Sequence, residues 1–462
     1  MTERRSALYD FHLRSALQLV KGGGEFMFPI AYTSPVEEHL NVRSNMGLQD
    51  LSSMGEVDLK GPGAERLLNY LLVNEVRDME PGQVRYSTMC NETGGVVDDV
   101  TVYKFHDEHF MVVASSGPRK KTARWLADQA IGTATYVTDI TASVALPVLQ
   151  GPRSRAFLKT VLQDSEVDLD RLRFFRFSKA RINEVELLLS RSGYTGELGF
   201  ELYTPAEEVG VLWDYLLREG RQYGLLPYGV AAMQSLRLEK ALVLYGNDVN
   251  EDYTPFHVGL DRWIRFDKRE FMGREALLRR QSEGLRERWV GLTLESPIPA
   301  SAFDRIYSVA DISTFREKMF SGSEADSYKE KVIAGQAVGH ITFSSRGHSV
   351  GQMLALGYVS SEYSWPGCNL VVDINGRLVL AKVSQTPFFD PSGARMRAKP
   401  QDDALQAHQQ AAPPAPALPP GTPSRAASEE VPPPDGSSNQ ADEGDSGSSP
   451  RSRGRRPKTN DE

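Results

Sequence analysis

The chain has 462 residues, 40% of them hydrophobic and 25% charged, an ordinary composition for a globular protein with room for two or three domains. A net charge of −8 at pH 7 leaves its body without the positive surface that nucleic-acid binding requires. The first ten residues hold no apolar h-region, so we expect no secretory signal, and no run approaches the roughly 18 apolar residues of a membrane span. The two cysteines, Cys90 and Cys368, form no Cys-x-x-Cys pair and are predicted to be reduced core thiols in a cytoplasmic protein.

Strand-like and helix-like segments alternate along the first part of the chain, and hairpin signals recur among them. Strict alternation favours a doubly wound parallel sheet, whereas recurring hairpins favour an α+β fold. We therefore predict an α+β body. The expected strands are 55–60, 110–114, 145–149 and 185–190, and the expected amphipathic helices are 63–72, 119–129, 151–161, 207–220 and 229–240.

Short strands separated by Gly and Pro turns dominate the segment that begins at Trp289. This pattern predicts a small antiparallel β-barrel. A boundary is expected near 281–288, where a charged helix end gives way to the first of these strands. It separates an N-terminal region, 1–283, from a barrel domain, 284–397. Within the barrel, a polar segment at about 301–335 is predicted to be a surface insertion.

The last part of the chain, 398–462, is rich in Pro, Ala, Ser, Gly and acidic residues and lacks aromatic side chains. Such a segment cannot bury enough apolar surface to offset the entropy lost on ordering, so it is expected to be disordered. It ends in a small basic cluster, Arg451 to Lys458. We interpret the segment as a solubilising tail, with a weak contact to nucleic acid or to an acidic partner as the alternative.

Two adjacent carboxylates interrupt a β-branched run, Val96 to Tyr103, that follows a Gly-Gly turn. Because side chains alternate along a strand, Asp98 and Asp99 must point to opposite faces. One acid can be solvated or cap a turn, and the other then faces inward, where a carboxylate is costly to bury without a partner. The alternative is an edge strand with both acids in water.

A second segment, Ser190 to Tyr203, carries three glycines between two strand-like runs, which allows the backbone to approach a ligand closely. It is not a phosphate loop, because no Gly-Lys-Ser/Thr follows. Glu201 lies in the strand after this connection and is suited to accept paired N–H donors from a planar heterocycle. The alternative is an outward-facing Glu on a half-exposed strand.

Other polar motifs carry less information. His106 and His109 fit a solvated hairpin turn better than a metal site, and we expect no metal ligands. His257 is expected to be a pocket-wall or core residue. Gly61-Pro-Gly63 lacks the third glycine and the strand–turn–helix context of a dinucleotide site, so no NAD or FAD domain is expected.

Short motifs recur in order over residues 25–390. They include Gly47-Leu-Gln-Asp-Leu-Ser-Ser-Met-Gly-Glu56, Gly94-Gly-Val-Val-Asp-Asp99, Ser192-Gly-Tyr-Thr-Gly-Glu197, Leu236-Arg-Leu-Glu239 and Thr254-Pro-Phe-His-Val-Gly-Leu260. Through these motifs the chain resembles the aminomethyltransferase (T-protein) family of the glycine cleavage system and its tetrahydrofolate-dependent relatives. The resemblance implies a three-lobed cloverleaf body that binds tetrahydrofolate, with the antiparallel barrel at its C-terminal end.

The resemblance also implies roles for single residues. Asp99 matches the acid beside the reactive folate nitrogens and is the expected catalytic residue. Glu201 matches the acid that grips the pterin ring. Tyr86 and Tyr194 match pocket tyrosines, whose rings can stack on or border the flat cofactor.

Val100 and Arg237 join the expected cofactor-binding residues. Within the Arg-Leu-Glu motif, Arg237 and Glu239 are expected chiefly to brace the scaffold.

The chain also departs from the family pattern. Ser53 stands where the family has a histidine, and Ala114-Ser-Ser-Gly117 replaces Asn-Ala-x-Asn. Met233 stands where the family has an arginine that helps to hold the folate-side ligand, and Arg395 and Arg397 are nearby candidates for a second arginine. These departures predict that the pterin grip is kept while the donor side has changed.

The implied function is a tetrahydrofolate-dependent one-carbon transferase, first of all the aminomethyltransferase of glycine cleavage, which gives methylene-tetrahydrofolate and ammonia. Its donor is carried by a lipoyl carrier protein or is a small molecule, and neither a nucleic acid nor a membrane is an expected partner. One alternative is a demethylase acting on an N-, O- or S-methyl compound. A second is a non-catalytic folate-binding protein, although Phe271 to Leu277 lacks the cysteine of that group's signature.

Overall fold

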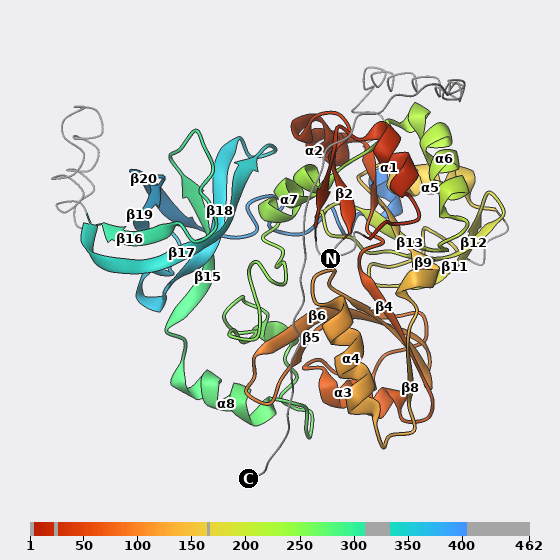
Figure 1. Cartoon of the computed structure of the whole chain (residues 1–462), viewed down its shortest axis with the longest axis horizontal. Coiled ribbons are helices and arrows are strands. Elements are labelled where there is room, and N and C mark those ends of the chain that lie inside the picture. Colours follow the sequence, from red (N-terminus) through yellow and green to blue (C-terminus); the bar gives the residue numbers. More distant parts are fainter. Residues whose placement is uncertain (1–3, 23–25, 164–166, 310–332, 404–462) are drawn as a thin grey trace, which may run out of the picture. The chain divides into compact units, whose positions relative to one another are not determined.

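The computed structural model of the chain describes residues 4–22, 26–163, 167–309 and 333–403 (Figure 1). Their strands form a two-stranded hairpin, two larger sheets and a closed barrel, with helices packed against the sheets. The α+β class is therefore confirmed. The predicted strands and amphipathic helices of the N-terminal region are all present, with ends that differ from the prediction by three residues or fewer.

The first large sheet is antiparallel throughout and contains the strand with the two adjacent acids. Alternation along β4 sends Val57 and Leu59 to the face covered by α3 (Ala64–Leu71) and α4 (Arg119–Ala130), where they join one core cluster (Figure 1). In spatial order the strands are β5 (Val84–Cys90), β6 (Val96–His106), β7 (His109–Ala114), β4 (Gly55–Lys60) and β8 (Tyr136–Asp139).

The second large sheet is mixed, because β14 pairs with β3 in parallel while its other pairs are antiparallel. Helices α5 (Ser154–Val161) and α6 (Val209–Gly220) share a core cluster with it, centred on the buried Trp213. In spatial order the strands are β11 (Phe177–Ile182), β12 (Val185–Ser190), β13 (Gly199–Pro205), β10 (Pro147–Gln150), β3 (Met46–Asp50) and β14 (Leu225–Pro227), and β9 (Val144–Ala145) also pairs with β13.

The two large sheets pack against each other through the faces that their helices leave uncovered. Tyr103 and Val113 of the first sheet and Val148 and Tyr203 of the second belong to one buried cluster. Alternation places Asp99 and Tyr103 on the same face of β6. The interface between the sheets is therefore where polar side chains of both sheets can meet.

The C-terminal strands close into a six-stranded antiparallel barrel, which confirms the predicted barrel. One part of the prediction is wrong: β16 lies inside the segment 301–335 that was expected to be a surface insertion, and Ile306 is buried in the barrel core. Residues 310–332 lie outside the described ranges. In spatial order the strands are β15 (Glu287–Leu294), β18 (Gln352–Ser360), β17 (Ile333–Gly347), β16 (Arg305–Val309), β19 (Asn369–Ile374) and β20 (Arg377–Ser384).

Residues 398–403 are placed against the second sheet's helices, so the expected tail begins too early. The Ala398 carbonyl oxygen accepts hydrogen bonds from Arg155 Nη2 at 2.6 Å and Arg191 Nη2 at 2.8 Å. Asp403 forms an ion pair with Arg155 at 3.1 Å. These contacts give two buried guanidinium groups carbonyl and carboxylate acceptors, which explains why the chain is ordered beyond its last aromatic residue. The rest of the predicted tail, including Arg451 to Lys458, lies outside the described residues.

The remaining elements connect these layers. Both cysteines are buried and free, as predicted. Among the described residues, no helix combines the length and the apolar character needed to span a bilayer.

The elements that connect the sheets and the barrel are α1 (Tyr9–Ser15), β1 (Gln18–Lys21), β2 (Met27–Ala31), α2 (Pro35–Ser44), α7 (Val230–Glu239) and α8 (Arg274–Glu283).

Candidate functional site

Asp99 is held by two hydroxyl groups from neighbouring strands. Tyr86 Oη, on β5, donates to Asp99 Oδ2 at 2.9 Å, and Ser115 Oγ, just after β7, donates to Asp99 Oδ1 at 3.2 Å. No cation lies within ion-pair distance of this carboxylate among the described residues. Burial raises the pKa of Asp99, and the two hydroxyl groups oppose that rise only in part. Asp99 is therefore a half-buried carboxylate whose charge no neighbouring cation among the described residues neutralises.

Asp98 occupies the other face of β6, and the structure corrects both sequence-based interpretations of it. It is not solvated, because its exposure is 0% and Thr122 of α4 lies 2.7 Å from its Oδ2. It is not on an edge strand, because β6 is paired on both sides, with β5 and β7. Helix α4 covers this face of the sheet, which a pattern confined to the strand does not reveal.

Glu201 is held by a pair of tyrosines that sequence analysis missed. Tyr103 Oη and Tyr203 Oη each donate to Glu201 Oε2 at 2.9 Å, and the two phenol oxygens are 2.8 Å apart. Burial raises the pKa of Glu201. Because Tyr103 belongs to the first sheet, Glu201 faces the interface between the sheets, and the alternative of an outward-facing glutamate is wrong. The available signal was Tyr103 itself, an aromatic residue on the Asp99 face of β6.

The tyrosine Tyr103 links the two candidate acids. Asp99 and Tyr103 lie four residues apart on one face of β6, which separates their Cα atoms by roughly 13 Å. The Tyr103 hydroxyl group crosses to the second sheet and contacts Glu201. Asp99 and Glu201 therefore lie at the same interface between the sheets.

Tyr194 and Arg237 lie beside the Asp99 end of this interface. Tyr194 Oη donates to the Val243 carbonyl oxygen at 2.6 Å, and the charge of Asp99 is one of the groups that influence its pKa. Arg237 is fully buried, pairs with Asp248 at 2.6 Å and stacks 4.5 Å from the Phe343 ring centroid. These contacts make Arg237 a scaffold residue that joins α7 to the barrel.

The side chain of Val100 points away from the candidate acid. It is 1% exposed and belongs to the core cluster under α3 and α4, on the face of β6 opposite to Asp99. The strand's alternation directs the Val100 side chain into the core, so a cofactor contact from this residue has only its backbone to use.

Comparisons with known protein families agree with this architecture. A model of the GCVT N-terminal domain matches residues 8–268, and a model of the glycine cleavage T-protein C-terminal barrel domain matches residues 321–390. The chain belongs to the glycine cleavage T-protein family.

Individual members of the family match most of the chain. The aminomethyltransferase of Moorella thermoacetica is 35% identical over 387 residues, which cover 84% of this chain and 98% of that protein. The aminomethyltransferase of Halothermothrix orenii is 33% identical over 84% of this chain and 100% of its own length. The crystal structure of aminomethyltransferase T from Bartonella henselae matches with a TM-score of 0.73 and 27% identity, covering 84% of this chain and 99% of that one.

The T-protein family uses tetrahydrofolate, and the donor set of this site fits that compound. Neither Asp99 nor Glu201 is neutralised by a cation among the described residues, and both accept hydrogen bonds from hydroxyl groups alone. On Glu201 the two tyrosine bonds fall on Oε2, and Ser192 also hydrogen-bonds to this carboxylate. A carboxylate oxygen accepts more than one hydrogen bond, so Oε1 retains acceptor capacity for a ligand. Uncharged N–H groups of a heterocycle are suitable donors to such carboxylates.

Two of the departures from the T-protein pattern, Ser53 and Ser116, lie next to Ser115, the residue that contacts both adjacent acids. Ser53 Oγ and Ser116 Oγ are 2.7 Å apart, so two of the substituted positions are bonded to each other. Met233 is half-buried and packs against a cluster that contains Tyr228. Arg395 donates to both carboxylate oxygens of Glu197, at 2.9 and 2.7 Å, which commits it to the scaffold.

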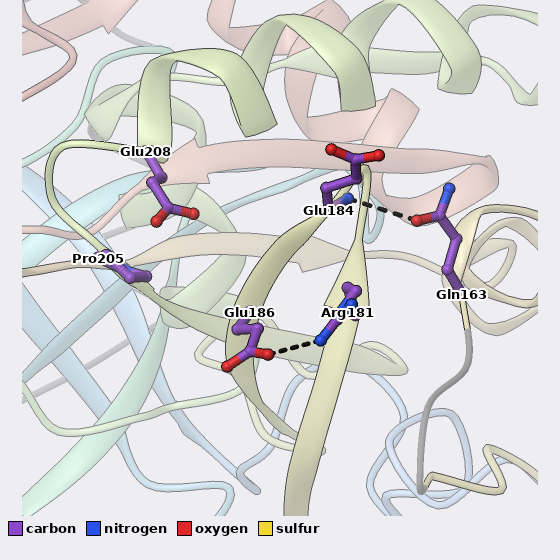
Figure 2. A pocket seen from close by; sticks show the side chains of 6 residues that line it. All are labelled: Gln163, Arg181, Glu184, Glu186, Pro205 and Glu208. Atoms are coloured by element: carbon purple, nitrogen blue, oxygen red, sulfur yellow. Dashed lines mark hydrogen bonds and ion pairs between the residues drawn. The ribbon is translucent and has the colours of Figure 1, made fainter.

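A surface cavity of about 660 Å³ lies at the β11–β12 hairpin, apart from the candidate acids (Figure 2). Two of its lining residues, Arg181 and Glu186, form an ion pair at 2.6 Å. It is open and acidic, which suits neither a pterin ring nor a negatively charged glutamate tail. The lining residues are Gln163, Arg181, Glu184, Glu186, Pro205 and Glu208.

Proposed function

We propose that this T-protein family member is an aminomethyltransferase of the glycine cleavage type. It moves a one-carbon unit from an aminomethyl group, carried on the lipoyl arm of a carrier protein, to tetrahydrofolate and releases ammonia. The observation that carries this proposal is the uncompensated Asp99 carboxylate, held by Tyr86 and Ser115 on the face that also leads to Glu201. Relatives named aminomethyltransferase match this chain over nearly their whole length.

Glu201 is assigned to binding. Tyr103 and Tyr203 fix the orientation of its carboxylate, because both phenol groups hold the same oxygen. The other oxygen accepts the N–H donors of the pterin ring. A carboxylate that is positioned before the ligand arrives loses little conformational entropy on binding.

Asp99 is assigned to catalysis. Tetrahydrofolate supplies the nucleophilic nitrogen of the reaction. The Asp99 carboxylate holds the proton-bearing folate amine in place and accepts its proton as the new bond forms. Tyr86 and Ser115 keep both carboxylate oxygens oriented, and the half-buried position strengthens the electrostatic interaction with the positive charge that develops on that amine.

The partner and the cellular compartment are part of the same proposal. A lipoyl carrier protein delivers the aminomethyl group, and the reaction takes place in the cytoplasm. The N-terminal region, 1–283, carries Asp99 and Glu201, and the barrel domain, 284–397, braces it through the contact between Arg237 and Phe343.

The proposal is tested by incubating the purified chain with tetrahydrofolate and aminomethyl-loaded lipoyl carrier protein. We expect equal amounts of ammonia and methylene-tetrahydrofolate. The Asp99→Asn variant should lose about 10²-fold or more in turnover while still binding tetrahydrofolate. Tetrahydrofolate binding without turnover of this donor by the unsubstituted chain would contradict the aminomethyl donor, and full turnover by Asp99→Asn would contradict the role of Asp99.

A further inference from the structure

The second acid of the pair, Asp98, has hydrogen-bond partners at both carboxylate oxygens. Its Oδ2 lies 2.7 Å from Thr122 Oγ1 and accepts the Ser115 backbone N–H at 3.3 Å. Its Oδ1 accepts the backbone N–H of Asp99 at 2.9 Å. Ser115 also donates through its hydroxyl group to Asp99. One serine therefore contacts both carboxylates.

The surroundings of this pair supply negative charge and no compensating cation. Asp248 lies close enough to influence the pKa of Asp99, but it is already paired with Arg237. Burial raises the pKa of Tyr245, and the charge of Asp98 contributes to that rise. The ammonium group of Lys121 donates to the Tyr245 hydroxyl group at 2.7 Å and to Glu251 at 2.7 Å, so that cation already has partners of its own.

The remaining titratable groups that face the pair are Tyr86 and Tyr194, which are neutral at ordinary pH. In the described part of the chain, no ion pair reaches either Asp98 or Asp99.

Two neighbouring carboxylates without a cation cannot both carry a charge at low cost, because burial and mutual repulsion both oppose the second ionisation. The charge is least costly on the acid that retains contact with solvent. Asp99 is half-buried, whereas Asp98 is completely buried. The Thr122 hydroxyl group, 2.7 Å from Asp98 Oδ2, can accept a hydrogen bond as well as donate one, so a proton on Asp98 has a partner.

We propose that Asp98 carries a proton at neutral pH and thereby leaves Asp99 as the single negative charge of the pair. Asp98 is then a positioning residue: it acts on the reaction through Asp99 and does not touch the substrate. Burial and the neighbouring charge of Asp99 raise the pKa of Asp98, in agreement with this assignment. When Asp98 loses its proton, its new charge competes with Asp99 for the donors of Ser115.

The protonation state is measured directly by infrared difference spectroscopy of the unsubstituted chain and the Asp98→Asn variant at pH 7. We expect the C=O stretching band of a buried, protonated carboxyl group in the former and its loss in the latter. The Thr122→Val variant should shift this band, because it removes the hydrogen-bond acceptor, and Thr122→Ser should restore it. A spectrum of the unsubstituted chain without a protonated carboxyl band assignable to Asp98 would overturn the inference.

The kinetic measurement rests on the proposed function, whereas the infrared measurement does not, so the two can fail separately. Asparagine mimics the neutral acid, so Asp98→Asn should keep turnover at pH 7 within about threefold and leave the acidic limb of the kcat profile in place. The variant should also lack the fall in kcat that ionisation of Asp98 causes in the unsubstituted chain at high pH. If the acidic limb instead moves down by about one pH unit or more, Asp98 is charged in the active protein and the inference is wrong.

Discussion

Tyr103 of the first sheet donates a hydrogen bond to Glu201 of the second at 2.9 Å, although the two residues are 98 positions apart in the chain. This bond couples the packing of the sheets to the orientation of the carboxylate assigned to pterin binding. Tyr203 provides a second, equal bond from the same sheet as Glu201. The pair allows the cross-sheet contribution to be measured against a matched local one.

Removing the cross-sheet hydroxyl group should weaken folate binding more than it weakens the fold. We expect Tyr103→Phe to bind tetrahydrofolate about 3- to 10-fold less tightly, because one hydrogen bond that orients Glu201 is lost. Calorimetric titration with tetrahydrofolate measures the change, and Tyr203→Phe is the matched control. Unchanged affinity in both variants would show that the tyrosines do not orient the carboxylate for its ligand.

These contacts also show how far the sequence could predict the site. Strict alternation along β6 correctly predicted that Asp98 and Asp99 point to opposite faces, because a strand's period of two does not depend on its neighbours. The same argument could not foresee the burial of Asp98, which depends on α4 packing over the opposite face. The partners of Glu201 were hidden for a similar reason, since Tyr103 reaches it only once the two sheets have packed.

Glu56 is a buried acid whose removal should stabilise the protein. It is completely buried on β4, and in the described structure neither of its carboxyl oxygens has a hydrogen-bond partner. Burial raises its pKa well above the usual value, so the folded chain keeps a proton that the unfolded chain loses above about pH 4.5. Stability therefore falls as pH rises through this window.

We expect Glu56→Met to unfold at higher urea concentration than the unsubstituted chain at pH 7, with a gain of about 1–3 kcal/mol. The gain should shrink towards pH 4, where the unfolded chain also holds the proton. Urea titrations at several pH values measure both effects, and Glu56→Gln serves as the polar control. A gain that does not change with pH would show that Glu56 is ionised in the folded protein.

The pKa of Glu239 is shifted in the opposite direction from that of Glu56. Burial opposes its ionisation, but the hydrogen bond and charge of His39 and the charge of Arg43 outweigh that effect and lower its pKa to about 2. Arg43 Nη2 lies 2.9 Å from the Glu239 carboxylate. Because the folded pKa is depressed, the stabilisation is complete above about pH 4.5 and is lost as pH falls towards 2.

The shift corresponds to about 3 kcal/mol of stability at neutral pH. Glu239→Gln should therefore be destabilised at pH 6 and should lose less stability than the unsubstituted chain as the pH falls from about 4.5 towards 2. Urea unfolding followed by circular dichroism measures the two slopes. Parallel slopes would contradict the ion pair as a source of acid sensitivity. Glu186→Gln, which alters an exposed acid paired with the exposed Arg181, is the surface control.

Lys268 caps the C-terminal end of helix α3, although it lies far from that helix in the sequence. Its Nζ donates to three backbone carbonyl oxygens, those of Asn69 at 2.5 Å, Leu72 at 2.7 Å and Asn74 at 2.8 Å. Burial lowers the pKa of Lys268 to about 7, and below that pH its ammonium group also interacts favourably with the helix dipole. The lysine thus joins the segment after α7 to the helix that covers the Asp98 face of the first sheet.

We expect Lys268→Met to lower the free energy of unfolding by about 3 kcal/mol or more, because three buried carbonyl groups lose their donor while the apolar stem is preserved. Lys268→Arg should fail to restore stability, because a planar guanidinium group cannot direct three donors at carbonyl groups arranged around one nitrogen. Thermal unfolding with tetrahydrofolate absent separates this effect from ligand binding. A loss below about 1 kcal/mol would show that water replaces the ammonium group at the helix end.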